Sequence, residues 1–121
     1  MGAARGPADL FANHPDALAL YEAVAKAVAA AGEAEVRTTK SQIAFRRRKG
    51  FAFLWRPGQY VDSDVPAVLS IALPERIESD RFKEVVRPSP KIWMHHLELR
   101  APDAIDAEVC NWLKAAYRAA G

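Results

Sequence analysis

Two short segments of this sequence hold the residue types best suited to chemistry. One is the pair His95 and His96, and the other is residues 46–49, which read Arg-Arg-Arg-Lys. An imidazole titrates near neutral pH, at a pKa of about 6.5, and can therefore move protons or bind anions. Clustered basic side chains attract phosphates and other anions. The two segments raise the questions of whether the histidines form a catalytic or metal site and whether the basic run binds an anion.

The histidines fall in residues 92–100, whose alternation of apolar and polar residues predicts a β-strand. Adjacent strand residues point to opposite faces of a sheet, so His95 and His96 cannot chelate one metal ion. His95 shares its face with Trp93 and Leu97 and is predicted to be a neutral core residue, whereas His96 points the other way. The sequence has no CxxC, HExxH or carboxylate cluster. We therefore expect no metal and no cofactor.

Catalysis finds little support elsewhere in the sequence. Ser41 and Cys110 are the other conceivable nucleophiles, but no catalytic motif surrounds either one. No partner base or oxyanion hole accompanies His96, so a structural role is favoured for each histidine. A small enzyme that uses His96 near Arg46 is the least favoured functional hypothesis.

The basic run is predicted to be the tip of a β-hairpin, because alternating apolar residues flank it on both sides. A three-residue loop of Arg48, Lys49 and Gly50, with Gly50 left-handed, gives the register that makes one face of the ribbon almost entirely apolar. In this register Arg48 and Lys49 are turn residues in water, and Arg46 lies on the second face. The predicted pairs are Arg47 with Phe51, Phe45 with Phe53, and Ile43 with Trp55.

The rest of the sequence predicts an α+β fold with a helix near each end. The segment from Asn13 to Gly32 has helical spacing of apolar residues, and Asn13 or His14 is its expected N-cap. A second helix is expected near the C-terminus, with Asp103 as N-cap and Asp106 in the capping-box position. Between the helices, six short alternating segments predict a mostly antiparallel sheet of five to six strands.

A length of 121 residues corresponds to one domain. We expect residues 11–121 to form this domain and residues 1–10 to be a loose N-terminal arm. In one predicted strand, Val68, Ser70 and Ala72 give one face a small-residue character. That face is either an open surface for a ligand, a partner protein or a second copy of the chain, or the place where the helices pack.

Composition and charge narrow the functional classes. The formal net charge is only +2, but seven of the 17 Lys and Arg residues lie in residues 37–56, where there is no acid. The single cysteine, Cys110, cannot form an internal disulfide, and we therefore expect a reducing, cytoplasmic environment. No apolar run is long enough to span a membrane and no secretory signal is visible, so we expect no membrane partner.

Four segments together resemble a known family: "HPDALALYEAV", "TTKSQIAF", "WMHHLEL" and "APDAIDAEVCNWLKAAYRAA". The most specific is the pattern D-x-E-x-x-x-W-L-x-x-A-Y from Asp106 to Tyr117. From about Phe11 to Ala119 the chain is similar to the bacterial domain of unknown function 5655. The resemblance implies a small α+β fold with a helix at each end, and it transfers no activity. It also implies recurring polar positions, which are Lys40, Ser41, Arg48, His95, His96 and Asp106.

The first functional hypothesis is therefore a binding module with a basic sheet surface for an anionic ligand, either nucleic acid or a phosphorylated metabolite. The alternative is a homodimer or a domain that binds a partner protein. The residues expected to contact an anionic ligand are Lys40, Ser41, Arg46, Arg48, His95 and His96.

Overall fold

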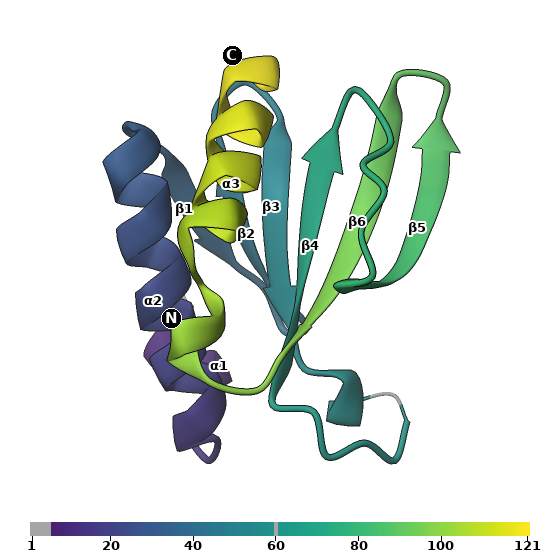
Figure 1. Cartoon of the computed structure of the whole chain (residues 1–121). Helices are drawn as coiled ribbons and strands as arrows, with labels where there is room; N and C mark the ends of the chain where they lie inside the picture. Colours follow the sequence, from purple (N-terminus) through teal and green to yellow (C-terminus); the bar gives the residue numbers. More distant parts are fainter. Residues whose placement is uncertain (1–5, 60) are drawn as a thin grey trace.

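The computed structural model describes residues 6–59 and 61–121. Two helices, α2 (Pro15–Ala31) and α3 (Ala107–Ala119), lie side by side on one face of a six-stranded sheet (Figure 1). All neighbouring strands are antiparallel, in the order β1-β2-β3-β4-β6-β5. The predicted α+β class is confirmed.

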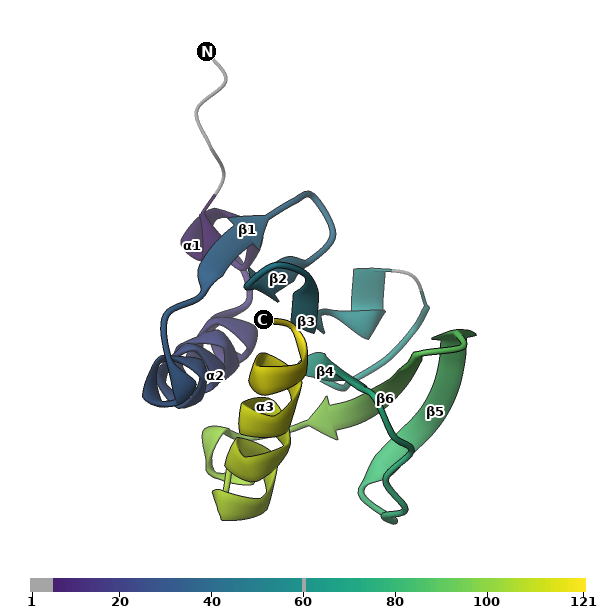
Figure 2. The same cartoon turned by 90° about the horizontal axis from the view of Figure 1, so that it is seen from above.

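The six strands correspond to the six alternating segments of the sequence. Their bounds are β1 Glu35–Thr38, β2 Ile43–Arg46, β3 Gly50–Trp55, β4 Ala67–Leu73, β5 Phe82–Ser89 and β6 Ile92–Leu99. A 3-10 helix follows β3 (η1, Pro57–Gln59), and another precedes α3 (η2, Pro102–Ala104). Figure 2 shows α2 and α3 on one side of the curved sheet and η1 on the other. We call the side away from the helices the second face.

The expected N-terminal arm lies partly outside the described residues, which begin at Gly6. Within the part that the structure describes, Pro7–Leu10 form a one-turn helix, α1. Helix α2 follows the predicted bounds: His14 is its N-cap, Pro15 opens the first turn, and Gly32 ends it. Gly32 has a φ of 152°, and the Tyr117 side chain occupies the place of a Cβ on Gly32. Both its backbone conformation and this contact therefore require glycine.

The predicted start of the C-terminal helix is wrong by three residues. Asp103 lies in η2 and is exposed, whereas Asp106 is the N-cap, and its Oδ1 accepts the Val109 N–H at 3.1 Å. Arg81 donates to the Asp106 carboxylate at 3.0 Å and to Glu108 at 2.9 Å. The hydrogen bond from the Val109 N–H, followed by the hydrogen bond and the positive charge of Arg81, holds the pKa of Asp106 below its ordinary value. The carboxylate that gains both partners sets the start of the helix.

A single hydrophobic core fills the space between the helices and the sheet face beneath them. The helices contribute Leu20, Val24, Val109 and Leu113 among others, and the strands contribute Ile43, Phe45, Leu54, Leu69, Ile71 and Leu99. Leu69 and Ile71 of β4 face the helices, so Val68, Ser70 and Ala72 lie on the second face. The alternative in which the helices pack on the small-residue side of β4 is therefore wrong.

The predicted register of the β2–β3 hairpin is also wrong, by one residue. Ile43 pairs with Leu54 and Phe45 with Ala52, and the loop between Arg46 and Gly50 consists of residues 47–49. A bulge next to Arg46 causes the shift. Gly50 is not left-handed, because Gly32 is the one glycine of the described chain with positive φ. Phe53 and Trp55 consequently lie on the second face, while Ile43 and Phe45 face the helices.

Packing explains why the bulge is favoured. It places Phe51 on the helix side, where it is 1% exposed. The Phe51 and Tyr117 rings are perpendicular there, and their centres are 5.7 Å apart. Gly50 then permits Phe53 to fold back, since a Cβ there would lie 2.7 Å from the Phe53 ring. Trp55, on the second face, finds a hydrogen-bond partner for its indole N–H in the Ser70 hydroxyl.

A substitution pair tests the corrected start of α3. Asp106→Ala removes the N-cap and one of the two carboxylates that hold Arg81, and we expect it to lower the midpoint of thermal unfolding measured by circular dichroism. Asp103→Ala removes an exposed carboxylate of η2 and is expected to leave the midpoint unchanged. An equal effect of both substitutions, or a larger effect at Asp103, contradicts this assignment.

Candidate functional site

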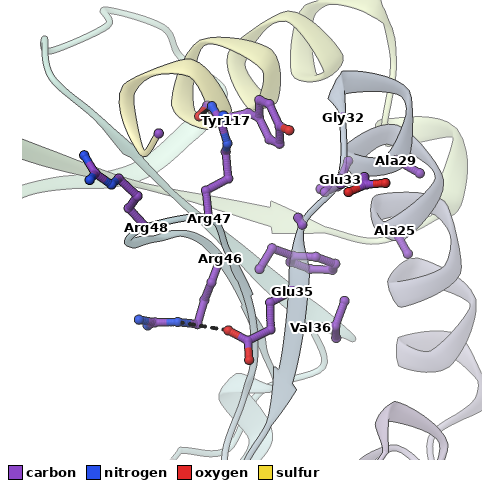
Figure 3. Close-up of a pocket in the computed structure, with 14 residues that line it drawn as sticks. Ala25, Ala29, Gly32, Glu33, Glu35, Val36, Arg46, Arg47, Arg48 and Tyr117 are labelled. Atoms are coloured by element: carbon purple, nitrogen blue, oxygen red, sulfur yellow. Dashed lines mark hydrogen bonds and ion pairs between the residues drawn. The ribbon is translucent and has the colours of Figure 1, made fainter.

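A groove of about 1160 Å³ opens where the C-terminal ends of α2 and α3 meet β1, β2 and the β2–β3 loop (Figure 3). We call it the corner groove. Its apolar lining residues include Ala25, Val28, Ala29, Val36 and Phe45. Its charged residues are Glu33, Glu35, Arg46, Arg47 and Arg48.

The three consecutive arginines leave the hairpin tip in different directions (Figure 3). Arg46 is directly opposite Glu35 in the β1–β2 register, and its Nε lies 3.7 Å from a Glu35 carboxylate oxygen. Arg47 donates to the Tyr117 carbonyl at 3.0 Å, and its guanidinium lies 4.1 Å from the centre of the Tyr117 ring. The Arg48 backbone N–H donates to the Ala120 carbonyl at 3.0 Å.

These contacts divide the arginines by role. Arg47 donates a hydrogen bond to a carbonyl in the last turn of α3, where a positive charge also interacts favourably with the helix dipole. Arg46 is partly neutralised by Glu35. The Arg48 side chain is exposed, and none of the described residues forms a hydrogen bond or ion pair with it. It is therefore the cation of the groove most available to a ligand.

The structure does not bring the six sequence-predicted ligand residues together. Lys40 and Ser41 lie in the β1–β2 turn, where the Thr39 hydroxyl accepts the Ser41 N–H at 3.2 Å. That turn is at the opposite end of β2 from Arg48. The four residues of β2 alone separate the two ends by about 13 Å. Arg46 and Arg48 border the corner groove, and Lys40 and Ser41 do not.

His95 lies on the helix side of the sheet and is 0% exposed, as predicted. Its Nε2 accepts the Ile77 N–H at 2.9 Å, so Nδ1 carries the proton and donates to the Trp93 carbonyl at 3.1 Å. The bond from Ile77 attaches the β4–β5 segment, residues 74–81, to the sheet. Burial lowers the pKa of His95, with a partial opposing effect from its hydrogen bonds to backbone carbonyls. His95 is structural.

His96 belongs to a hydrogen-bonded chain on the second face. The Trp55 indole N–H donates to Ser70 Oγ at 2.9 Å, and Ser70 Oγ lies 2.7 Å from His96 Nδ1. The indole N–H can only donate, and among the described residues His96 Nδ1 is the acceptor within reach of the Ser70 hydrogen. We therefore assign the serine as donor to Nδ1, which places the imidazole proton on Nε2. Burial lowers the pKa of His96, although Glu84 partly opposes this effect. The neutral ring therefore presents an Nε2 donor at the second face.

Sequence reasoning missed Ser70 as a partner of His96. Ser70 is 3% exposed and its hydroxyl links Trp55 to His96, so it is positioned as a structural link rather than as a nucleophile. The one signal in the sequence is that Ser70 lies on the same face of β4 as the small residues Val68 and Ala72. This signal predicts the face of the sheet on which Ser70 lies, but not that it contacts His96. A hollow of about 500 Å³ lies beside Trp55, between Pro57 and Lys83.

The structure also separates Arg46 from His96. Strands β3 and β4 lie between β2 and β6, which puts their backbones about 14 Å apart at three strand spacings. The Nε of Arg46 lies 3.7 Å from a Glu35 carboxylate oxygen on β1, and its terminal Nη1 lies beside Gly50 of β3, the neighbouring strand. One small substrate would not contact both side chains, so the basis for an enzyme that uses this pair is lost.

The fold and groove define a small α+β domain with a charged cleft at one corner of its sheet. The chain belongs to the family "Domain of unknown function (DUF5655)", whose model matches residues 8–120. Searches of curated proteins and of solved structures found no match. Among the described residues, no helix has the length and apolar character needed to cross a membrane.

The lowered pKa values of the two strand histidines predict a pH dependence of stability. The unfolded chain binds their protons more tightly than the folded chain, so the free energy of unfolding should fall as the pH drops from 7 to 5. Urea denaturation of a double variant, His95→Gln with His96→Gln, is expected to show a smaller decrease over this range. A decrease equal to that of the unsubstituted chain would contradict the buried neutral state of both rings.

The different roles of neighbouring arginines predict different stabilities. Arg47→Ala removes a hydrogen bond to α3 and the stacking on Tyr117, and we expect a loss of about 1 kcal/mol in the free energy of unfolding. Arg48→Ala is expected to change it by less than about 0.5 kcal/mol, as is usual for exposed side chains. Denaturant titration of the two variants measures the difference, and equal losses would refute the division of roles.

Proposed function

We propose that this domain is a binding module that takes an anionic ligand at the corner groove. The observation that carries the proposal is Arg48, an exposed guanidinium without a partner among the described residues, at the rim of a groove that Arg46 and Arg47 also border. A guanidinium offers five N–H donors in a geometry that fits carboxylate and phosphate oxygens.

The ion pair of Arg46 is compatible with this role. Its partner Glu35 is 55% exposed, and exposed ion pairs contribute about 0–1 kcal/mol. A ligand anion can therefore replace Glu35 at little cost. The side chains that line the groove include three guanidinium groups, of Arg46, Arg47 and Arg48, and two carboxylates, of Glu33 and Glu35.

The ligand classes favoured by the sequence are nucleic acid and a phosphorylated metabolite, because residues 37–56 contain no acid. Contacts with phosphates release counterions, so their affinity falls steeply as salt increases. The proposal retains a cytoplasmic location, which rests on the single cysteine, Cys110.

Fluorescence anisotropy with a labelled single-stranded oligonucleotide, and competition by inorganic pyrophosphate, test the proposal at about 50 and 200 mM salt. Arg48→Ala is expected to weaken binding and, if it removes one phosphate contact, to reduce the salt slope by about one. Glu33→Gln is expected to strengthen binding, because it removes a negative charge that repels an anionic ligand from the groove.

Lys40→Ala is the matched control, since it also removes one exposed positive charge but lies at the other end of β2. It is expected to leave the affinity nearly unchanged. If Lys40→Ala weakens binding as much as Arg48→Ala, the corner groove is not the site. If no anion binds at about 50 mM salt, a condition that favours phosphate contacts, the nucleic-acid and phosphate forms of the proposal are wrong.

A further inference from the structure

The outer edge of the sheet beside the corner groove has unpaired backbone groups. β1 ends the strand order, so no described strand pairs with its outer side. The Thr39 N–H donates to the Gln42 carbonyl at 2.9 Å, across the turn that joins β1 to β2. Hydrogen-bonded and non-hydrogen-bonded pairs alternate along an antiparallel ladder, so Arg37 and Glu35 also bond toward β2. The N–H and C=O groups of Val36 and Thr38 therefore point outward.

Helix α2 and the edge of β1 enclose the apolar part of the groove. Ala25 and Ala29 of α2 face Val36 of β1 across it (Figure 3). Val36 is 42% exposed, although its neighbour in the register, Phe45, is fully buried. Small side chains on the helix and an exposed valine on the strand leave room beside β1 for another extended segment.

The open shape and the charge of the groove favour a peptide over a small metabolite or a nucleic acid. Small-molecule sites usually enclose most of the ligand surface, whereas this groove is open to solvent. The arginines lie only at the Glu35 end of β1. A chain of phosphates along the groove would meet apolar side chains over the rest of its length, whereas an extended peptide can place apolar residues there.

We propose that the occupant of the corner groove is an extended acidic peptide segment of a partner protein, which adds a strand to the outer edge of β1. The inference rests on the proposed function, because it uses the same arginines to hold the anionic groups. The Val36 and Thr38 backbones pair with the peptide. Small apolar side chains at alternate peptide positions lie against Ala25 and Ala29. Figure 3 shows Arg48 on the far side of Arg46 and Arg47 from Val36, so the carboxylates belong to the part of the peptide that continues past the Glu35 end of β1 and crosses the β2–β3 loop.

Synthetic fluorescein-labelled peptides of alternating valine and threonine test this inference. Two carry a pair of glutamates, at the N-terminal end in one and at the C-terminal end in the other, so that both the parallel and the antiparallel orientation of the peptide beside β1 are tested. Two matched peptides carry glutamine instead. We expect one glutamate peptide to bind, its glutamine form to bind at least about tenfold more weakly, and Arg48→Ala to reduce the difference.

Two variants test the backbone pairing. Val36→Pro removes an outward N–H without removing a β1–β2 hydrogen bond, and we expect an affinity loss of about tenfold or more. Val36→Thr keeps that N–H and a β-branched side chain, and its affinity is expected to stay within about twofold. Circular dichroism of the two variants checks that both are folded.

Hydrogen exchange of the unsubstituted chain gives a readout that needs no variant. Addition of the glutamate peptide is expected to protect the amide protons of Val36 and Thr38, while those of Glu35 and Arg37 are already protected. Peptide binding without this protection overturns the inference. So does protection without peptide in a chain that light scattering shows to be a dimer, since a second copy then occupies the edge.

The outcomes also separate this inference from the proposed function. If the peptides fail but the oligonucleotide or pyrophosphate binds and depends on Arg48, the anion site stands and the peptide inference falls. If the peptides, the oligonucleotide and pyrophosphate all fail at about 50 mM salt, both proposals fall.

Discussion

The bulge in β3 is the constraint on which the rest of the structure depends. One extra residue, Phe51, moves to the helix side and meets Tyr117, and every later side chain of β3 changes face relative to a regular hairpin. The same contact brings the β2–β3 loop against the last turn of α3, where Arg47 and the Arg48 backbone bond to Tyr117 and Ala120. The corner groove exists because hairpin tip and helix end are joined in this way.

The second face shows the other consequence of that bulge. With Trp55 on this face, the indole N–H donates to Ser70, and the Ser70 hydroxyl donates to His96 Nδ1. The chain accounts for a nearly buried serine on a side of the sheet that the helices leave uncovered. Buried polar groups are costly unless they are paired, so these three residues act as a unit that fixes the neutral form of His96.

The sequence predicts the elements well because their signals are local. Alternation marks the six strands, and Pro15 and Gly32 mark the ends of α2. The bulge leaves no comparable signal, since residues 51–55 are apolar on both faces and either register buries a mostly apolar set. A helix start with two candidate aspartates has the same ambiguity, and one of the contacts that distinguish Asp106 comes from Arg81, which is distant in the sequence. Periodicity cannot identify contacts between residues far apart in the sequence.

The candidate site depends even more on contacts between residues that are far apart in the sequence. Arg46, Arg47 and Arg48 are identical neighbours, but strand parity pairs Arg46 with Glu35, the end of α3 binds Arg47, and the turn leaves the Arg48 side chain exposed. The sequence alone does not indicate which of the three is available to a ligand.

The two edges of the sheet show a further difference that periodicity does not reveal. β5 has two irregularities in its pairing and a proline, Pro88, which are features that discourage pairing with another strand. β1 pairs without irregularity and has neither feature. Its charged side chains, Glu35 and Arg37, lie on the second face, because the helix side of β1 carries Val36. An edge left regular beside an apolar groove and a free guanidinium is the edge at which an added strand meets the least resistance.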